Sequence, residues 1–182
     1  RSLGEFKESR LRWIFNRAKI AWEKLLQASI AYILSNYDLK EGVLVLDDSD
    51  KMRSRNTTKI SGVHKVKDKK TGGYFEGQEF VFLLLVTNKI TIPVGFQFYV
   101  PNPAIKKWKE VIKAQKKAGI PAKNREKYPA MDPNYPSKQM LGLELLKTFS
   151  QNHTNITVKA VLADALYGNQ EFMDKAAEIT HC

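Results

Sequence analysis

Apolar residues recur every three or four positions over the first part of the chain. From about Ser9 to Tyr37 neither proline nor glycine interrupts this spacing. A period near 3.6 residues is that of one face of an α-helix, so the pattern predicts one long amphipathic helix. We expect this helix to pack against a neighbouring element, although its arginines could also contact phosphate.

Two short runs of apolar residues further along predict central β-strands, which are covered on both faces. The first is Val43–Leu46 and the second is Thr157–Ala163. Each run leads directly into an acidic residue, Asp47 after the first and Asp164 after the second. The pattern therefore predicts two buried strands that each end on a carboxylate.

A third and a fourth apolar run predict a β-hairpin. Phe80–Thr87 and Ile90–Val100 are separated by only two residues, which is the length of a tight hairpin turn. Pro93 places the second strand at a sheet edge or beside a bulge. The other predicted elements are a short strand at 63–66 and helices at 105–118, 138–151 and 169–178. Strand, hairpin, helix, strand and helix in this order predict a mixed α/β fold.

Length and charge narrow the class of protein. At 182 residues the chain is long enough for one globular domain with a core, and no apolar run approaches the roughly 20 residues that cross a bilayer. Its formal net charge of +11 favours a polyanionic partner, nucleic acid first and an anionic membrane second. A single cysteine, Cys182, excludes an internal disulfide and makes a cysteine-built zinc site implausible, as expected in a reducing compartment.

The positive charge is densest between residues 101 and 136. From Lys106 to Lys127 there are nine Lys or Arg residues against two Glu. They form either a solvated surface or a track for nucleic-acid phosphates. The nine basic residues are Lys106, Lys107, Lys109, Lys113, Lys116, Lys117, Lys123, Arg125 and Lys127.

Asp47 and Asp164 are the candidate catalytic residues. Ligands of open α/β sheets bind outside the carboxyl ends of the strands, so the two acids converge if their strands are neighbours. A hard divalent cation relieves the repulsion between two carboxylates, and a pair of such ions can clamp both oxygens of a phosphodiester being cleaved. Asp48 and Asp50 are either secondary ligands or solvated turn residues, and Lys51 either neutralises the acids or meets a phosphate.

Four segments together resemble the DDE transposases of bacterial insertion sequences, which have an RNase H-like catalytic core. The segments are Asp47-Asp-Ser49 after a strand, Gly62-Val-His64, Gly77-Gln78 before an apolar hairpin, and Ala163-Asp-Ala-Leu-Tyr-Gly168. The resemblance covers roughly residues 40 to 180. It implies that Asp47 is the family's first acid and Asp164 its second.

The resemblance also implies a fold and a domain organisation. We expect an RNase H-like mixed sheet with flanking helices, incomplete at the C-terminus and preceded by the long helix. Residues 1–38 would be the remnant of a preceding DNA-binding region, and 39–182 a partial catalytic domain with a basic insertion at about 101–136. The family's third acid, a Glu on a later helix, would lie outside the chain, because Glu171 and Glu178 do not occupy its position. We therefore expect the fragment alone to be inactive.

The implied activity is phosphodiester hydrolysis and strand transfer at the ends of a mobile element, with Mg²⁺ or Mn²⁺ held by Asp47 and Asp164. The partners would be DNA at the element ends and target, together with a second copy in the complete protein. The implied location is the bacterial cytoplasm, at the nucleoid.

Other classes are compatible with parts of this pattern. One is a basic DNA-binding module whose acids are vestigial. Another is a Mg²⁺-dependent phosphatase of the haloacid-dehalogenase type, whose Asp-x-Asp motif is imitated by Asp48-Ser-Asp50, although an immediate hairpin fits that class poorly. A phosphorylation receiver domain is disfavoured because no Asp lies between Leu84 and Phe98.

Overall fold

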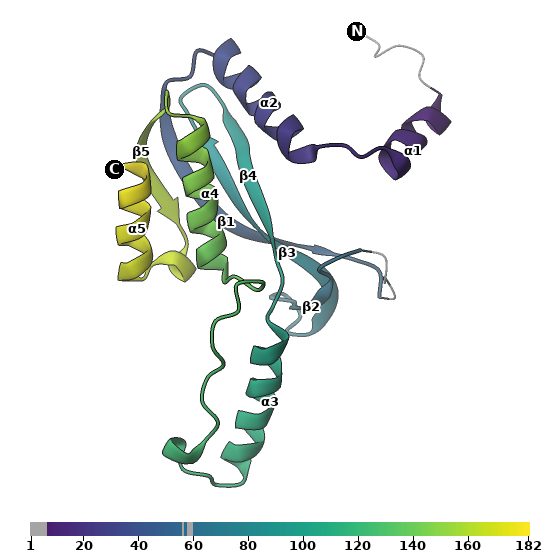
Figure 1. Cartoon of the computed structure of the whole chain (residues 1–182), viewed down its shortest axis with the longest axis vertical. Helices are drawn as coiled ribbons and strands as arrows, with labels where there is room; N and C mark the ends of the chain where they lie inside the picture. Colours follow the sequence, from purple (N-terminus) through teal and green to yellow (C-terminus); the bar gives the residue numbers. More distant parts are fainter. Residues whose placement is uncertain (1–6, 56, 58–59) are drawn as a thin grey trace. The chain divides into compact units, whose positions relative to one another are not determined.

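The computed structural model describes residues 7–55, 57 and 60–182 and divides the chain into two compact units (Figure 1). The first unit ends at Asp38 and the second is Leu39–Cys182. Each unit is described by itself below. In the described part of the chain, no helix is long and apolar enough to cross a membrane.

The first unit contains two helices, α1 (Glu8–Arg17) and α2 (Trp22–Asn36), so the prediction of one long helix was wrong. The chain leaves the helix at Ala18, which is extended. In an unbroken helix Phe15 and Trp22 would lie about 10 Å apart along the axis. The break allows the two rings to stack, with centroids 6.0 Å apart and an angle of 4° between their planes. None of the residues of α1 is buried, so no core packing holds the helix straight through this point.

A five-stranded mixed sheet forms the centre of the second unit. Its strands are β1 (Glu41–Met52), β2 (His64–Lys67), β3 (Tyr74–Val86), β4 (Thr91–Tyr99) and β5 (Thr157–Ala163). The strand order is β2-β3-β1-β5, and β4 also pairs with β3. β1 is antiparallel to β3 and parallel to β5. This arrangement confirms the predicted mixed α/β class. The prediction that Thr157–Ala163 is a central, buried strand was wrong, because β5 lies at the end of the strand order and none of its residues is buried.

The predicted hairpin is confirmed, together with the role expected of its proline. β3 and β4 pair antiparallel, and their register shifts between Leu83, which is opposite Gly95, and Leu84, which is opposite Pro93. β4 has no described partner strand other than β3. Pro93 therefore lies in an edge strand and at a bulge, where its missing N–H costs little.

Two helices cover one face of the sheet, α4 (Lys138–Asn152) and α5 (Gln170–Thr180) (Figure 1). α4 packs against α5 and against β3 and β4. The core between sheet and helices consists of alternating strand residues and of one stripe of each helix. Its main members are Leu44, Leu46, Val81, Leu83, Leu85, Leu141, Leu145, Leu146, Phe149 and Phe172.

The basic segment forms an arm, defined here as residues 103–128. It consists of α3 (Pro103–Lys117), a short 3-10 helix η1 (Ala122–Asn124) and an irregular segment that runs back along α3. The arm projects away from the sheet (Figure 1). The Trp108 indole N–H donates to the Glu126 carbonyl at 3.0 Å, and the Trp108 and Tyr128 rings meet edge to face at 4.9 Å. These contacts hold the returning chain against α3.

The close approach of α4 to β4 depends on a glycine. A Cβ at Gly95 would lie 2.9 Å from the Leu145 Cδ2 atom, below any normal contact. We expect Gly95→Ala to lower the free energy of unfolding by about 1–3 kcal/mol through overpacking, measured by urea denaturation. Gly73→Ala is the control, since its nearest neighbour would be at 3.4 Å. Equal effects of the two substitutions would contradict this account of the packing.

Candidate metal site and nucleic-acid interface

β1 does not end at the acids, contrary to the sequence-based expectation. It continues for five residues beyond Asp47, because β3 is long enough to pair with it from Asp47 opposite Phe82 to Met52 opposite Gly77. What ends at this point is the pairing with β5, whose last matched residues are Leu46 and Ala163. The parallel ladder stops there, although the strand does not.

Asp47 and Asp164 occupy the next positions along these two neighbouring strands. Neighbouring strands lie about 4.8 Å apart, so the register brings the two backbones close together. Both residues are exposed. The condition set by the sequence, that the two acid-bearing strands be neighbours, is met.

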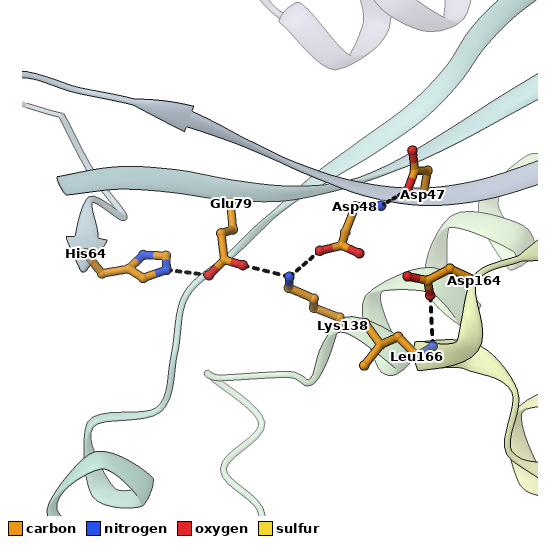
Figure 2. Close-up of polar contacts among 7 residues, drawn as sticks. All are labelled: Asp47, Asp48, His64, Glu79, Lys138, Asp164 and Leu166. Carbon is orange, nitrogen blue, oxygen red and sulfur yellow. Dashed lines mark hydrogen bonds and ion pairs between the residues drawn. The ribbon is translucent and has the colours of Figure 1, made fainter. Parts of the chain in front are cut away.

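Each carboxylate of the pair is oriented by a local backbone N–H. Asp47 Oδ1 accepts from the Asp48 N–H at 2.8 Å, and Asp164 Oδ1 accepts from the Leu166 N–H at 2.9 Å as the cap of a short 3-10 helix, η2 (Ala165–Tyr167). In each case the second oxygen has no partner among the contacts that the structure describes. Figure 2 shows Asp47 and Asp48 on opposite sides of β1, with the Asp48 carboxylate pointing toward that of Asp164.

A chain of ionic contacts runs beside this pair. The Lys138 ammonium donates to Asp48 Oδ2 at 2.6 Å and to Glu79 Oε1 at 2.7 Å, and His64 Nε2 lies 2.9 Å from Glu79 Oε2 (Figure 2). The four side chains are between 14% and 20% exposed, so solvent screens these contacts much less than surface ion pairs. They come from β1, β2, β3 and the first residue of α4.

Burial and hydrogen bonding have opposite effects on the pKa values of Glu79 and Lys138. Burial is the largest influence on Glu79 and favours its neutral form, but the hydrogen bonds from Lys138 and His64 together lower its pKa below the ordinary value. Burial likewise disfavours the charged form of Lys138, yet the bonds to Asp48 and Glu79 raise its pKa. The geometry therefore stabilises both groups in their charged forms.

Sequence reasoning missed Lys138 and instead considered Lys51 as the residue that neutralises the acids. Lys51 is exposed on β1, opposite Gln78. A signal for Lys138 was present, because a cation at the first position of a helix is disfavoured by the helix dipole and calls for a nearby acid. No such rule indicates which acid, since Asp48 is 90 residues away in sequence.

Tyr167, three residues beyond Asp164, is buried. It is 1% exposed, its ring contacts that of Phe172 with centroids 5.2 Å apart, and its hydroxyl has no described hydrogen-bond partner. Burial raises the pKa of this phenol, and the charges of Asp48, Asp164 and Asp47 raise it further. One buried hydroxyl is therefore within electrostatic reach of all three carboxylates.

The donor set suits one class of metal. Within the described ranges, no three or more His, Cys, Asp or Glu side chains are grouped closely enough to hold an ion. Zn²⁺ sites are built from at least three such ligands. Mg²⁺ is commonly held by one or two carboxylates that leave the remaining positions to water and phosphate, so two aspartates match Mg²⁺ in the number and type of ligands. Figure 2 shows the Asp47 carboxylate on the opposite side of β1 from the Asp48 carboxylate, which points toward Asp164.

The arm carries all nine basic residues named from the sequence. The half-buried positions of α3 are Ile105, Trp108, Ile112 and Gln115, which repeat every three or four residues. All six lysines of α3 are exposed. At about 100° per residue, five of them fall within an arc of about 100° that adjoins the half-buried stripe. These five are Lys106, Lys109, Lys113, Lys116 and Lys117.

The fold defines a class, an RNase H-like mixed α/β domain, in which Asp47 and Asp164 directly follow the last parallel pair of β1 and β5. A family model described as DDE superfamily endonuclease matches residues 4–179, and the chain belongs to this family. Neither the search of curated proteins nor that of solved structures gave a significant match. Family membership and the antiparallel β1–β3 pairing remove the support for the phosphatase alternative.

The lowered pKa of Glu79 has a consequence for stability. A carboxyl whose pKa is lowered by folding stabilises the protein above its unfolded pKa, ordinarily 4.5, and this contribution is lost as the pH falls through the folded value. We expect Glu79→Gln to lose less stability than wild type between about pH 5 and about pH 3. Urea denaturation at each pH measures this, and exposed Glu144→Gln on α4 is the control. Parallel curves for wild type and Glu79→Gln would contradict the assignment.

Proposed function

We propose that this chain is the catalytic core of a DDE transposase of the insertion-sequence type, which hydrolyses DNA at the ends of a mobile element and joins them to target DNA. The observation that carries the proposal is the position of Asp47 and Asp164, directly beyond the last parallel pair of β1 and β5, in a member of the DDE endonuclease family. The partners would be element-end and target DNA and a second copy of the protein, in the bacterial cytoplasm.

Asp47 and Asp164 would hold Mg²⁺ or Mn²⁺ through the oxygens that accept no backbone N–H. When bound, the metal would supply Lewis-acid stabilisation of charge on the phosphodiester oxygens. The protein's own contribution is orientation. The backbone N–H groups of Asp48 and Leu166 fix one oxygen of each carboxylate, which leaves the other free to meet a ligand.

The arm would hold the DNA backbone. Its lysine face extends from Lys106 to Lys117, about 16 Å along the helix, and is exposed over its whole length. The neighbouring half-buried stripe of α3 packs against the returning chain through Trp108 and Gln115. The lysines are therefore presented outward from a supported helix, as contacts to a phosphate backbone require.

Two carboxylates are fewer than the three acids that the family resemblance implies. Glu171 is paired with Lys175 along α5, at 2.6 Å, rather than with the two aspartates. Among the described residues, no third acid joins Asp47 and Asp164 in a group that could hold a metal ion.

A second candidate is a DNA-binding module that uses no metal. It is favoured by the exposed lysine face and by the lack of a three-ligand cluster in the described chain. The two candidates differ in what the aspartates do.

Substituting the aspartates separates the candidates. We expect Asp47→Asn and Asp164→Asn each to weaken Mn²⁺ binding at least about tenfold, because each removes a charged ligand. Isothermal titration calorimetry measures the affinity. DNA affinity without metal should stay within about twofold of wild type, and Asp50→Asn is the control. Unchanged Mn²⁺ binding in both variants would favour the metal-free module.

Neutralising the lysine face tests the arm. We expect Lys106, Lys109 and Lys113→Gln together to weaken binding to duplexes of any sequence. The slope of log K against log salt should fall by about 3, since each phosphate that is no longer neutralised removes about 0.9. Fluorescence anisotropy over a salt series measures both the affinity and the slope.

The control for the arm is Lys65, Lys67 and Lys147→Gln, which makes the same change in net charge at exposed positions of β2 and α4. Equal losses of affinity in both triple variants would mean that net charge alone drives binding and that the arm is not the contact surface.

A further inference from the structure

The first turn of α4 contacts both segments that follow the parallel β1–β5 ladder. Lys138 donates to Asp48 on β1 at 2.6 Å. The next residue, Gln139, donates from its side-chain amide to the Leu166 carbonyl, also at 2.6 Å. Leu166 belongs to η2, which follows β5 and is capped by Asp164. One helical turn therefore bridges the two segments at the point where the strands cease to pair with each other.

The start of α4 is fixed by capping and by packing. The Ser137 hydroxyl caps the helix by accepting from the Met140 N–H at 3.2 Å. One turn further on, a Cβ at Gly142 would lie only 3.2 Å from the Tyr167 ring, so the helix lies against the core at this point. The backbone of Gln139 between them is therefore held at a defined position.

The short helix η2 has little packing of its own to hold Leu166. It consists of three residues, and 3-10 helices have poorer hydrogen-bond geometry than α-helices. Tyr167 is its buried residue, whereas the Leu166 side chain is 44% exposed. The core therefore anchors the end of η2, and the hydrogen bond from Gln139 anchors Leu166.

The position of Leu166 decides the direction of the Asp164 carboxylate. The Leu166 N–H donates to Asp164 Oδ1 at 2.9 Å, as Figure 2 shows. A displacement of Leu166 would lengthen this bond or rotate the carboxylate with it. The contact between Gln139 and the Leu166 carbonyl thus acts on the carboxylate through one residue of backbone.

We propose that Gln139 is a positioning residue that fixes the Asp164 carboxylate for metal binding by holding Leu166. This inference rests on the proposed metal binding by Asp164, and it concerns Asp164 alone, whichever ligands complete the site. The Gln139 amide fixes the Leu166 carbonyl, and the Leu166 N–H fixes Asp164 Oδ1. The second oxygen of Asp164 is thereby presented in one direction. Groups that hydrogen-bond behind a metal ligand strengthen binding in this way, because the ligand has less freedom to lose.

Removing the amide donor tests the role of Gln139. Gln139→Met keeps the length and helix propensity of the side chain but removes its N–H donors. We expect this substitution to weaken Mn²⁺ binding about tenfold, as is usual for partners of a metal ligand. Isothermal titration calorimetry on the full 182-residue chain measures the affinity. Gln151→Met is the matched control and should leave the affinity unchanged, because Gln151 is exposed at the other end of α4.

A second measurement, made without metal, distinguishes positioning from general stabilisation. Hydrogen exchange of the Leu166 amide, followed by NMR, should be faster in Gln139→Met than in wild type, since the N–H leaves Asp164 more often. The midpoint of urea denaturation should stay close to that of wild type, because Gln139 lies at the surface of the core rather than within it. A purely structural Gln139 would lower the midpoint and leave the Mn²⁺ affinity of the folded chain unchanged, which would overturn the inference.

The outcomes separate this inference from the proposed function. Mn²⁺ binding that Asp164→Asn weakens and Gln139→Met does not would overturn only the role of Gln139. Weaker binding in Gln139→Met without faster exchange of the Leu166 amide would also count against the inference, since the effect would not pass through Leu166. If wild type bound no Mn²⁺, or if Asp164→Asn bound it as tightly as wild type, the proposed metal site would be wrong and the inference would fall with it.

Discussion

The pairing of β1 on both of its edges is the constraint on which the rest of the structure depends. β3 pairs antiparallel with β1 over ten residues, from Val43 to Met52, and β5 pairs parallel with it only as far as Leu46. The difference between these two lengths leaves Asp47 and Asp164 beyond the parallel ladder while β3 still supports the backbone of Asp47. The backbones of the two acids are thus placed by hydrogen bonds that do not depend on the charge of their side chains.

The acids near the end of β5 and the lysines of α3 lie on different parts of the second unit. Of the three acids near the end of β5, one is bound by Lys138 and two face outward without a cation among the ion pairs described. The exposed lysines of α3 lie on an arm that projects from the sheet (Figure 1). A chain of net charge +11 can keep a negative centre because its dense lysine face does not fold back onto it. The proposed binding of a polyanion by the arm and of a divalent cation by the acids would then be compatible within one domain.

Close packing of α4 links the end of the β1–β5 ladder and the Lys138–Asp48 ion pair to the core. Gly142 of α4 faces the Tyr167 ring, where a Cβ would lie only 3.2 Å from Tyr167 Cε1 and 3.4 Å from Leu46 Cδ1. The helix that carries Lys138 at its start therefore also lies directly over Tyr167 and the end of the parallel ladder. A shift of α4 would move both the ion pair with Asp48 and the packing beneath Asp164, because protein interiors transmit such strain.

The sequence by itself determined the element types, the hairpin with its edge proline, the basic arm and the two acid-bearing strands. These follow from hydrophobic period, turn chemistry and local charge, which depend on near neighbours. Tertiary structure alone decided that β1 continues past its acids, because the length of a strand depends on its partner. It also decided that the first helix breaks where Phe15 stacks on Trp22, and that Lys138 rather than Lys51 neutralises Asp48. Contacts between residues 90 positions apart leave no periodic trace in a sequence, since only the folded chain brings such residues together.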